Sequence, residues 1–236
     1  MDTYWILGDL VAIGPQPVEV LDRISELPNV CVTRGNTDRY TTLLERPFPT
    51  QTDVRLDTDL LPVFTEIAHS FAWTLGCVAA TGWFEYLADL PLEVRLELPN
   101  GTRLLGVHAA PGTDDGDGIH PESDITELRC MLADSNTDLV CIGHTHWPLD
   151  MRVENHHVVN LGSVSNHRTP DLMACYVLLE TDRSGYRIVH HRVPYDRNAA
   201  ISAIRAAHHP SEHYLLGFLD GRFIAHRWSE PLVRFG

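Results

Sequence analysis

Two short apolar segments separated by an amphipathic one open the chain, and this order constrains the fold more than any other feature. Residues 3–8 and 30–34 are apolar runs that predict strands, and each ends near a glycine followed by a polar residue. Residues 15–28 carry apolar side chains at helical spacing and predict a helix with prolines at both ends. A strand, a helix and a strand in this order place the two strands parallel, with ligand-binding loops at their carboxyl ends. The sequence therefore predicts an α/β protein.

The rest of the chain continues with predicted helices and strands. Alternating apolar residues around the Asn-Gly pair at 100–101 predict a hairpin whose second strand ends at His108. Residues 41–57, rich in proline, threonine and acids, predict an irregular loop. The other predicted helices span 58–75, 79–89, 122–134 and 197–207, and the other strands span 138–143, 149–153, 157–161, 171–180 and 185–193. We expect one domain at 1–207, with a tail at 208–236 that packs on it or forms an interface in a homo-oligomer.

The net charge of the chain and its cysteines indicate which partners and which cellular compartment to expect. With 32 acidic and 18 basic residues, the formal net charge is −14, which argues against an extended nucleic-acid or anionic-membrane surface. An anionic substrate would then require a metal ion or a small arginine cluster. No apolar run is long enough to span a membrane, no signal peptide opens the chain, and the five cysteines form no CxxC pair. We therefore expect a cytoplasmic protein without membrane contact.

A polar side chain of the metal-binding type follows each of four predicted strands. Asp9 alone also suits a turn or a helix cap, and a lone histidine is more often structural. His-x-His after a glycine is a stronger signal, because alternate positions put both rings on one side of an extended segment. Carboxylate, amide and imidazole together suit Mn, Fe, Zn or Ni. The sequence thus predicts a metal site at one sheet edge, formed by Asp9, Asn36, His108, His144 and His146.

The ordered motifs resemble those of a known family. "GDLVAIGPQP", "RGNTD", "VHAAPG" and "GHTH", together with "NLGSV" at 160–164, are similar to motifs of the calcineurin-like metallophosphoesterases, and most closely to the small bacterial phosphodiesterases of that superfamily. The resemblance runs from the first residues to about residue 200. It implies a four-layer α-β-β-α sandwich that holds two divalent ions between the loops at the strand ends. Mn²⁺ is the first expectation, with Fe, Zn or Ni as alternatives.

The resemblance also implies a role for each candidate ligand. Asp9 would bridge the two ions, Asn36, His108 and His144 would complete the shell of one, and His146 would bind the other. The ions would bind the phosphoryl oxygens and turn a bridging water into the attacking hydroxide. The substrate would be a phosphate-ester small molecule.

The chain departs from the family pattern in two places. A first strand ending in Asp-x-His normally precedes the Gly-Asp motif. Because this strand is absent here, the resemblance implies a sandwich that lacks its first strand and helix. Such a sandwich would hold one metal ion or two. We expect a strand ending in Asp-x-His to be encoded upstream of Met1. The second departure is "GNTD", where Thr37 stands in place of the usual histidine. A hydroxyl cannot serve as a general acid near neutral pH, so we expect a slow enzyme or one restricted to good leaving groups.

These observations lead to one leading hypothesis and two alternatives. The leading hypothesis is a metal-dependent phosphoesterase acting on phosphodiesters or small phosphomonoesters. Its expected catalytic residues are Asn36, Thr37 and Asp38, the last of which also suits a cap of the next helix. His120 and Arg168 are candidates for substrate binding, His120 as a possible replacement for the missing general acid and Arg168 as a phosphate contact. The alternatives are a catalytically impaired member of the fold that serves as a protein-binding scaffold, as one retromer subunit does, and a mononuclear zinc hydrolase.

Overall fold

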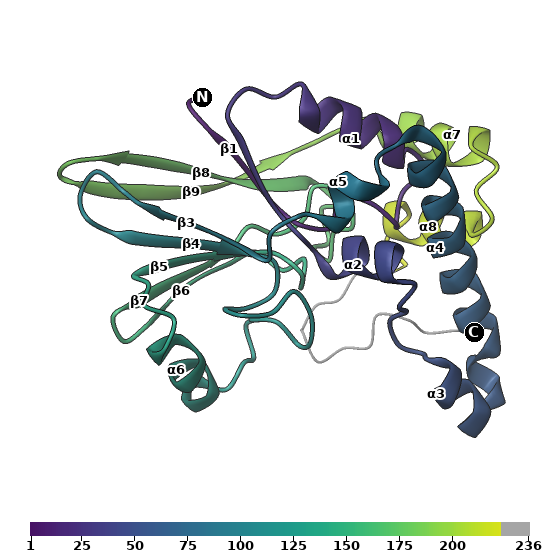
Figure 1. Cartoon of the computed structure of the whole chain (residues 1–236), viewed down its shortest axis with the longest axis horizontal. Coiled ribbons are helices and arrows are strands. Elements are labelled where there is room, and N and C mark those ends of the chain that lie inside the picture. The colour runs from purple at the N-terminus through teal and green to yellow at the C-terminus, as the bar shows by residue number, and fades with distance from the viewer. Residues whose placement is uncertain (223–236) are drawn as a thin grey trace.

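The computed structural model describes residues 1–222 and shows two packed layers of strands between helices (Figure 1). The larger sheet has five strands in the order β3-β4-β5-β7-β6, in which β4, β5 and β7 are parallel. Both edge strands, β3 and β6, run antiparallel to their neighbours. These strands are β3 (Glu93–Glu97), β4 (Arg103–Val107), β5 (Leu139–Ile142), β6 (Leu149–Val153) and β7 (His156–Asn160).

The second layer of strands consists of two pairs. β1 (Tyr4–Leu7) and β2 (Val30–Thr33) pair in parallel, which confirms the opening strand-helix-strand unit. β8 (Ala174–Asp182) and β9 (Gly185–Val193) form an antiparallel hairpin. Side chains of β1 and of the hairpin pack against the same face of the five-stranded sheet, through Trp5, Val177 and Leu179. The two pairs therefore cover that sheet together.

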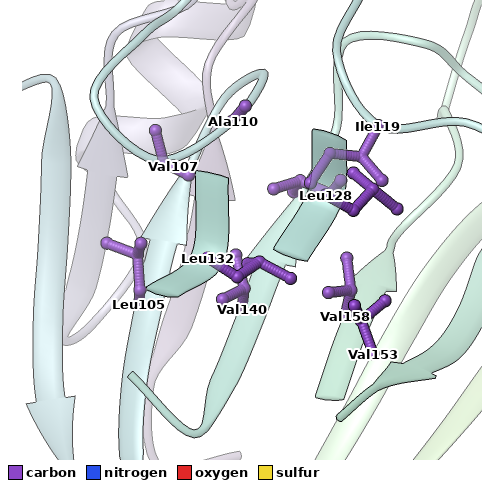
Figure 2. Packing of buried hydrophobic residues seen from close by; sticks show 10 residues of the cluster. Leu105, Val107, Ala110, Ile119, Leu128, Leu132, Val140, Val153 and Val158 are labelled. Carbon is purple, nitrogen blue, oxygen red and sulfur yellow. The ribbon is translucent and has the colours of Figure 1, made fainter. Parts of the chain in front are cut away.

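Apolar side chains fill both faces of the five-stranded sheet, because successive residues of a strand point to opposite faces. Leu139 and Cys141 of β5 face the second layer of strands, whereas Val140 and Ile142 face the helix α6 (Ile125–Ala133). Figure 2 shows Leu128 and Leu132 of α6 packed over the sheet residues of this core. This two-sided burial explains why the central strands are apolar throughout.

Helices form the layer outside β1 and β2. Leu21 of α1 (Pro17–Ser25), Val78 of α4 (Leu61–Thr81) and Leu87 of α5 (Phe84–Ala88) are fully buried and join one core cluster with Val32 of β2. With α6 on the far side, the layers run helix, strand, strand, helix. The predicted four-layer α/β sandwich is confirmed.

Two regions of the predicted helix pattern are wrong. Residues 41–57 are not an irregular loop, because α2 (Asn36–Leu43) extends into them and α3 (Gln51–Leu56) lies within them. A capping box starts α3: the Thr50 hydroxyl accepts from the Asp53 amide, and the Asp53 carboxylate accepts from the Thr50 amide. That T-x-x-D signal is visible in the sequence.

The second error concerns residues 58–89. The predicted helices at 58–75 and 79–89 are instead a short 3₁₀ turn, η1 (Thr58–Leu60), followed by α4, which is continuous to Thr81, and then α5. The break falls at Gly82, whose φ of 85° ends the helix in the left-handed region. The other predicted helices and strands are confirmed to within three residues at each end.

The C-terminal part adds two helices that pack against each other. Ile204 of α7 (Arg197–Ala206) meets Leu215 and Leu219 of α8 (Glu212–Leu219), and Ile13 packs against this cluster. The beginning of the predicted tail therefore packs on the main body. Residues 223–236 lie outside the described residues, and the domain boundary stays a prediction.

One helical stretch within residues 1–222 has the length and composition of a membrane-spanning helix. It runs from Thr58 to Thr81. Its 18-residue segment of highest hydropathy has a mean hydropathy of 1.2, and 22% of that segment is buried. Core helices of soluble proteins meet the same criteria of length and composition, so these criteria alone do not establish a membrane span. The expectation of no membrane contact stays a prediction.

Candidate metal centre

The loops after β1 and β2 touch at the edge where these strands end, and two glycines permit the contact. A Cβ atom on Gly8, which has a φ of 80°, would lie 2.5 Å from the Gly35 nitrogen and 2.7 Å from His108 Nδ1. A Cβ atom on Gly35 would lie 2.2 Å from Asp9 Oδ1. The absence of both side chains brings Asp9 against the first turn of α2.

The Asp9 carboxylate is held at that turn by Thr37. Its Oδ1 accepts a hydrogen bond from the Thr37 amide at 3.0 Å, and the Thr37 hydroxyl lies 2.8 Å from the same oxygen. The hydroxyl is also 2.8 Å from the Val11 carbonyl oxygen, so its single proton is committed to these acceptors. Burial alone would raise the pKa of Asp9, but the charge of His108 and the Thr37 amide hold it well below its usual range. Asp9 is therefore ionised.

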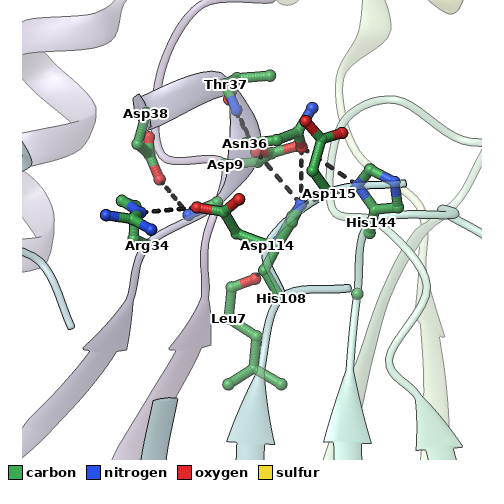
Figure 3. Close-up of polar contacts among 12 residues, drawn as sticks. Leu7, Asp9, Arg34, Asn36, Thr37, Asp38, His108, Asp114, Asp115 and His144 are labelled. Carbon is green, nitrogen blue, oxygen red and sulfur yellow. Dashed lines mark hydrogen bonds and ion pairs between the residues drawn. The ribbon is translucent and has the colours of Figure 1, made fainter. Parts of the chain in front are cut away.

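Two histidines from neighbouring strand ends direct the ring nitrogens that do not contact a backbone carbonyl at one point. His108 Nδ1 donates to the Leu7 carbonyl oxygen at 2.6 Å, and His144 Nε2 donates to the Gly116 carbonyl oxygen at 2.8 Å. Because a carbonyl only accepts, each ring in its neutral form carries its proton on this atom, and His108 Nε2 and His144 Nδ1 then have the lone pairs. These two nitrogens face Asn36 (Figure 3).

The distances among these atoms suit a bound cation. His108 Nε2 lies 3.1 Å from Asn36 Oδ1, 3.3 Å from His144 Nδ1 and 3.3 Å from Asp9 Oδ1. His144 Nδ1 lies 3.2 Å from Asn36 Oδ1. Ligand atoms about 2.1 Å from an ion are roughly 3.0–3.4 Å apart in octahedral or tetrahedral geometry. Four lone-pair atoms at this spacing repel one another unless a proton or a metal ion lies between them.

We call Asp9, Asn36, His108 and His144 the Asn36 cluster. In the part of the chain that the structure describes, no group of three or more His, Cys, Asp or Glu side chains alone is arranged to hold a metal ion. The set is complete only with the amide oxygen of Asn36, which lies close to both histidine nitrogens. Carboxylate, amide and two imidazoles fit a first-row divalent ion, so these residues fit the predicted group.

A proton and a metal ion compete for the same position in this cluster. Burial alone would lower the pKa of His108, but the adjacent Asp9 carboxylate raises it to about 9. Burial and the His108 charge lower the pKa of His144, which is therefore neutral. Metal binding must displace the proton from His108 Nε2.

Three of the predicted ligands have strained backbones. Asp9, His144 and His146 have φ values of 55°, 61° and 60°, in the left-handed region that costs an L-residue about 1–2 kcal/mol. Such strain concentrates at functional sites, where the surrounding contacts enforce it. Asn160 is one such contact, since its side-chain amide donates to the Gly143 carbonyl oxygen at 2.6 Å and to the Thr145 hydroxyl at 2.9 Å.

His146 lies in the same cleft but apart from the Asn36 cluster. It is half-buried and makes no hydrogen bond with the residues of 1–222. Burial lowers its pKa to about 4, so the ring is neutral and able to bind a metal ion. Arg168 lines the cleft as well, and burial lowers its pKa to about 10, which leaves the guanidinium charged at neutral pH.

Asp38 and His120 lie away from the cleft surface. Asp38 Oδ1 accepts from the amides of Leu10 at 2.9 Å and Val11 at 3.3 Å, and Oδ2 accepts from the Gly35 amide at 2.8 Å. It thus joins the loops after β1 and β2, and burial together with the Asp9 charge raises its pKa to about 7. His120 does not line the cleft, and its Nδ1 accepts from the Glu122 amide at 3.2 Å. The catalytic and substrate-binding roles of these two residues stay predictions.

The sequence analysis missed an ion-pair network that supports the cluster. Asp114 is buried and accepts from Arg34 Nε at 2.7 Å and Arg39 Nε at 3.0 Å, and Asp115 accepts from Arg39 Nη2 at 2.7 Å and from the Tyr40 hydroxyl. The contacts of Arg39 and Tyr40 tie α2 to the loop whose Gly116 carbonyl orients His144. Figure 3 shows the contact of Arg34 with Asp114. The acids in "TDDGDG" and the arginines in "RGNTDR" are visible in the sequence, but their pairing is not.

A cleft of about 380 Å³ opens beside the cluster. Its polar lining residues are Asp9, Asn36, Thr37, Ser70, Asp117, His144, Thr145, His146 and Arg168, and we call the group that contains the Asn36 cluster the polar side. Its apolar and aromatic lining residues are Ile13, Tyr40, Pro47, Phe48, Ile67, Phe71 and Tyr214, of which Ile13, Tyr40, Ile67 and Phe71 pack together, and we call this group the apolar side. An anionic group that binds the polar side would hold any attached organic group near the apolar side.

Comparison with known proteins identifies the family. Residues 1–184 match the profile of the calcineurin-like phosphoesterase superfamily domain. The chain belongs to this superfamily. Members of the superfamily depend on metal ions, generally divalent ones, and the resemblance of the sequence motifs is confirmed.

Two solved structures have a similar fold. A hypothetical protein from Pyrococcus horikoshii OT3 superposes with a TM-score of 0.74 at 23% identity, over 93% of this chain and 84% of that chain. A metallophosphoesterase from Sphaerobacter thermophilus superposes with a TM-score of 0.69 at 22% identity, over 93% of this chain and 88% of that chain. No curated protein sequence matches this phosphoesterase chain.

Proposed function

We infer that this chain is a metal-dependent hydrolase of phosphodiesters or small phosphomonoesters, with the Asn36 cluster as its principal metal site. The observation that carries this inference is the convergence of four possible ligand atoms, which come from four separate strand ends and whose reported spacings are 3.1–3.3 Å. Membership of the phosphoesterase superfamily supports the choice of substrate class. We propose Mn²⁺ as the ion, with a second and weaker position at His146.

The residues of the cleft divide the work in the proposed reaction. Divalent ions bound here would neutralise phosphoryl oxygens and make water a better nucleophile near neutral pH. Arg168 adds a fixed positive charge on the polar side of the cleft. Thr37 positions Asp9 and offers no proton at neutral pH, because its hydroxyl is committed to Asp9 and Val11. The proposed enzyme therefore favours esters with good leaving groups.

A metal titration combined with a hydrolysis assay tests the proposal. Native mass spectrometry with added Mn²⁺ should show one ion bound tightly and a second at higher concentration, and bis(p-nitrophenyl) phosphate should be hydrolysed only by the loaded protein. Asn36→Ala should weaken Mn²⁺ binding and hydrolysis by at least about 100-fold, since loss of a ligand costs more than loss of its supporting contacts.

Asn155→Ala is the matched control, because Asn155 is exposed in the β6–β7 turn. It should bind Mn²⁺ and hydrolyse the ester like the parent. A folded parent protein that binds no Mn²⁺ would overturn the proposal and favour the protein-binding scaffold.

A further inference from the structure

The apolar side of the cleft is built from parts of the chain that are distant in sequence. Tyr40 lies in α2, and Phe48 lies in the segment before α3. Ile67 and Phe71 belong to α4, and Tyr214 belongs to α8. α8 lies beyond residue 184, where the match to the superfamily profile ends. The C-terminal part of this chain thus contributes directly to the cleft.

Three aromatic rings of this side, those of Tyr40, Phe71 and Tyr214, pack against neighbouring side chains. The Tyr40 and Phe71 rings pack edge to face with their centroids 6.0 Å apart, and Ile13 and Ile67 pack against this pair. The ring of Tyr214 packs edge to face on Phe218 at 5.4 Å. The side is therefore a preformed surface of aromatic and aliphatic groups.

Two polar groups of this side are already used within the protein. The Ser70 hydroxyl donates to the Ala12 carbonyl oxygen at 2.7 Å, and the Tyr40 hydroxyl donates to Asp115. A sugar or a nucleobase bound here would lose its hydrogen bonds to water. Ser70 and Tyr40 cannot replace them, so binding would cost free energy. An apolar group placed here gains from leaving water.

We propose that the preferred substrate is a phosphate ester whose organic group is apolar, with its phosphate at the Asn36 cluster and that group against Phe48, Ile67, Phe71 and Tyr214. This inference rests on the proposed function and names its substrate class. The volume of about 380 Å³ accommodates a phosphate with one ring system or a short alkyl chain. Phe48 is 69% exposed, and the bound ester would bury part of its ring.

Phosphonates test the proposal without hydrolysis, because their carbon–phosphorus bond is not an ester. Methyl-, hexyl- and phenylphosphonate and inorganic phosphate are titrated calorimetrically into the full-length, Mn²⁺-loaded protein. Phenyl- and hexylphosphonate should bind at least about tenfold more tightly than methylphosphonate, as expected for burial of that much apolar surface. The tighter of the two identifies an aryl or an alkyl ester as the natural type.

Variants locate the preference on the apolar side. Phe48→Ala should lower the ratio of phenyl- to methylphosphonate affinity by about threefold or more, with little effect on folding because the side chain is exposed. Ile67→Glu should reverse the preference, since its carboxylate repels apolar groups and the phosphonate. Leu56→Ala and Leu56→Glu are the matched controls, because Leu56 is 83% exposed on α3 and does not line the cleft.

The outcomes separate this inference from the proposed function. Equal binding of all three phosphonates within twofold overturns the apolar-ester inference and leaves the phosphoesterase proposal intact. Failure of inorganic phosphate and all three phosphonates to bind the loaded protein overturns both. A phenyl preference that survives in Phe48→Ala and in Ile67→Glu also contradicts the proposed location.

Discussion

The Asn36 cluster and the surroundings of His146 differ sharply, although both border the same cleft. In the cluster, both histidine rings are oriented by a backbone carbonyl, and the carboxylate is held by Thr37. His146 has a strained backbone and a neutral ring but no orienting hydrogen bond to the described residues. Supporting contacts fix ligand geometry and raise metal affinity. The difference supports our proposal that the Asn36 cluster is the stronger metal position and that His146 belongs to a second, weaker one.

Removing a ligand from the cluster should have the largest effect. His108→Gln replaces a buried ring that contacts Leu7, Asp9 and Asn36, and we expect Mn²⁺ affinity to fall by at least about 100-fold, with loss of hydrolysis. Calorimetry with Mn²⁺ measures the change, and circular dichroism checks the fold. His69→Gln, an exposed change on α4, should leave both unaltered. A folded His108→Gln protein that binds Mn²⁺ as tightly as the parent would remove the cluster from consideration.

The pH dependence of metal binding should reveal the proton that occupies the same position. The pKa of His108 is about 9 without an ion, so below pH 9 binding must release one proton. Affinity should rise about tenfold per pH unit from pH 7 and level off above about pH 9. Calorimetry in buffers of different ionisation enthalpy counts the protons released. Release of none at pH 7 would show that His108 is not a ligand.

His146→Ala should separate the two positions. The first Mn²⁺ should bind within about threefold of the parent affinity, whereas the second position and hydrolysis should weaken by about tenfold, because a neutral imidazole ligand is lost. His209→Gln is a matched control: burial also lowers the pKa of His209 to about 4, but its ring packs on Trp73 at 4.6 Å, outside the cleft. Weakening of the first ion by His146→Ala as large as that by His108→Gln would contradict the division into two positions.

The candidate ligands could be predicted from the sequence because the fold places them by a simple rule. Asp9, Asn36, His108 and His144 each follow an apolar strand, and within each sheet the carboxyl ends of parallel strands lie at one edge. The packing of the two sheets then brings the edge of β1 and β2 against that of β4 and β5. The supporting contacts of the candidate ligands could not be predicted in the same way. The carbonyl groups of Leu7 and Gly116 carry no sequence signal, since any residue supplies one, and only the loop path directs them at the rings.

The apolar side of the cleft was invisible in the sequence for a related reason. Tyr40, Phe71 and Tyr214 appear in the sequence as ordinary core or tail residues, and their proximity depends on how α2, α4 and α8 pack. The continuity of α4 was also missed: separate helices are predicted at 58–75 and 79–89, whereas the helix ends only at Gly82, which supplies the left-handed residue. Local patterns predict elements well, but tertiary packing decides which of their faces share a cavity.

The smallest expected effect concerns the hydroxyl that holds Asp9. Thr37→Val keeps the shape of the side chain and the amide hydrogen bond to Asp9 but removes the hydroxyl contacts at 2.8 Å with Asp9 and Val11. Mn²⁺ affinity should fall by about three- to tenfold, less than for any ligand, because a supporting contact is lost and the ligand remains. Thr37→Ser, which keeps the hydroxyl, should restore most of the affinity in the same calorimetric titration. Equal losses in both variants would mean that the methyl group, packed in the buried first turn of α2, matters more than the hydroxyl, and that Asp9 is held by the backbone amide alone.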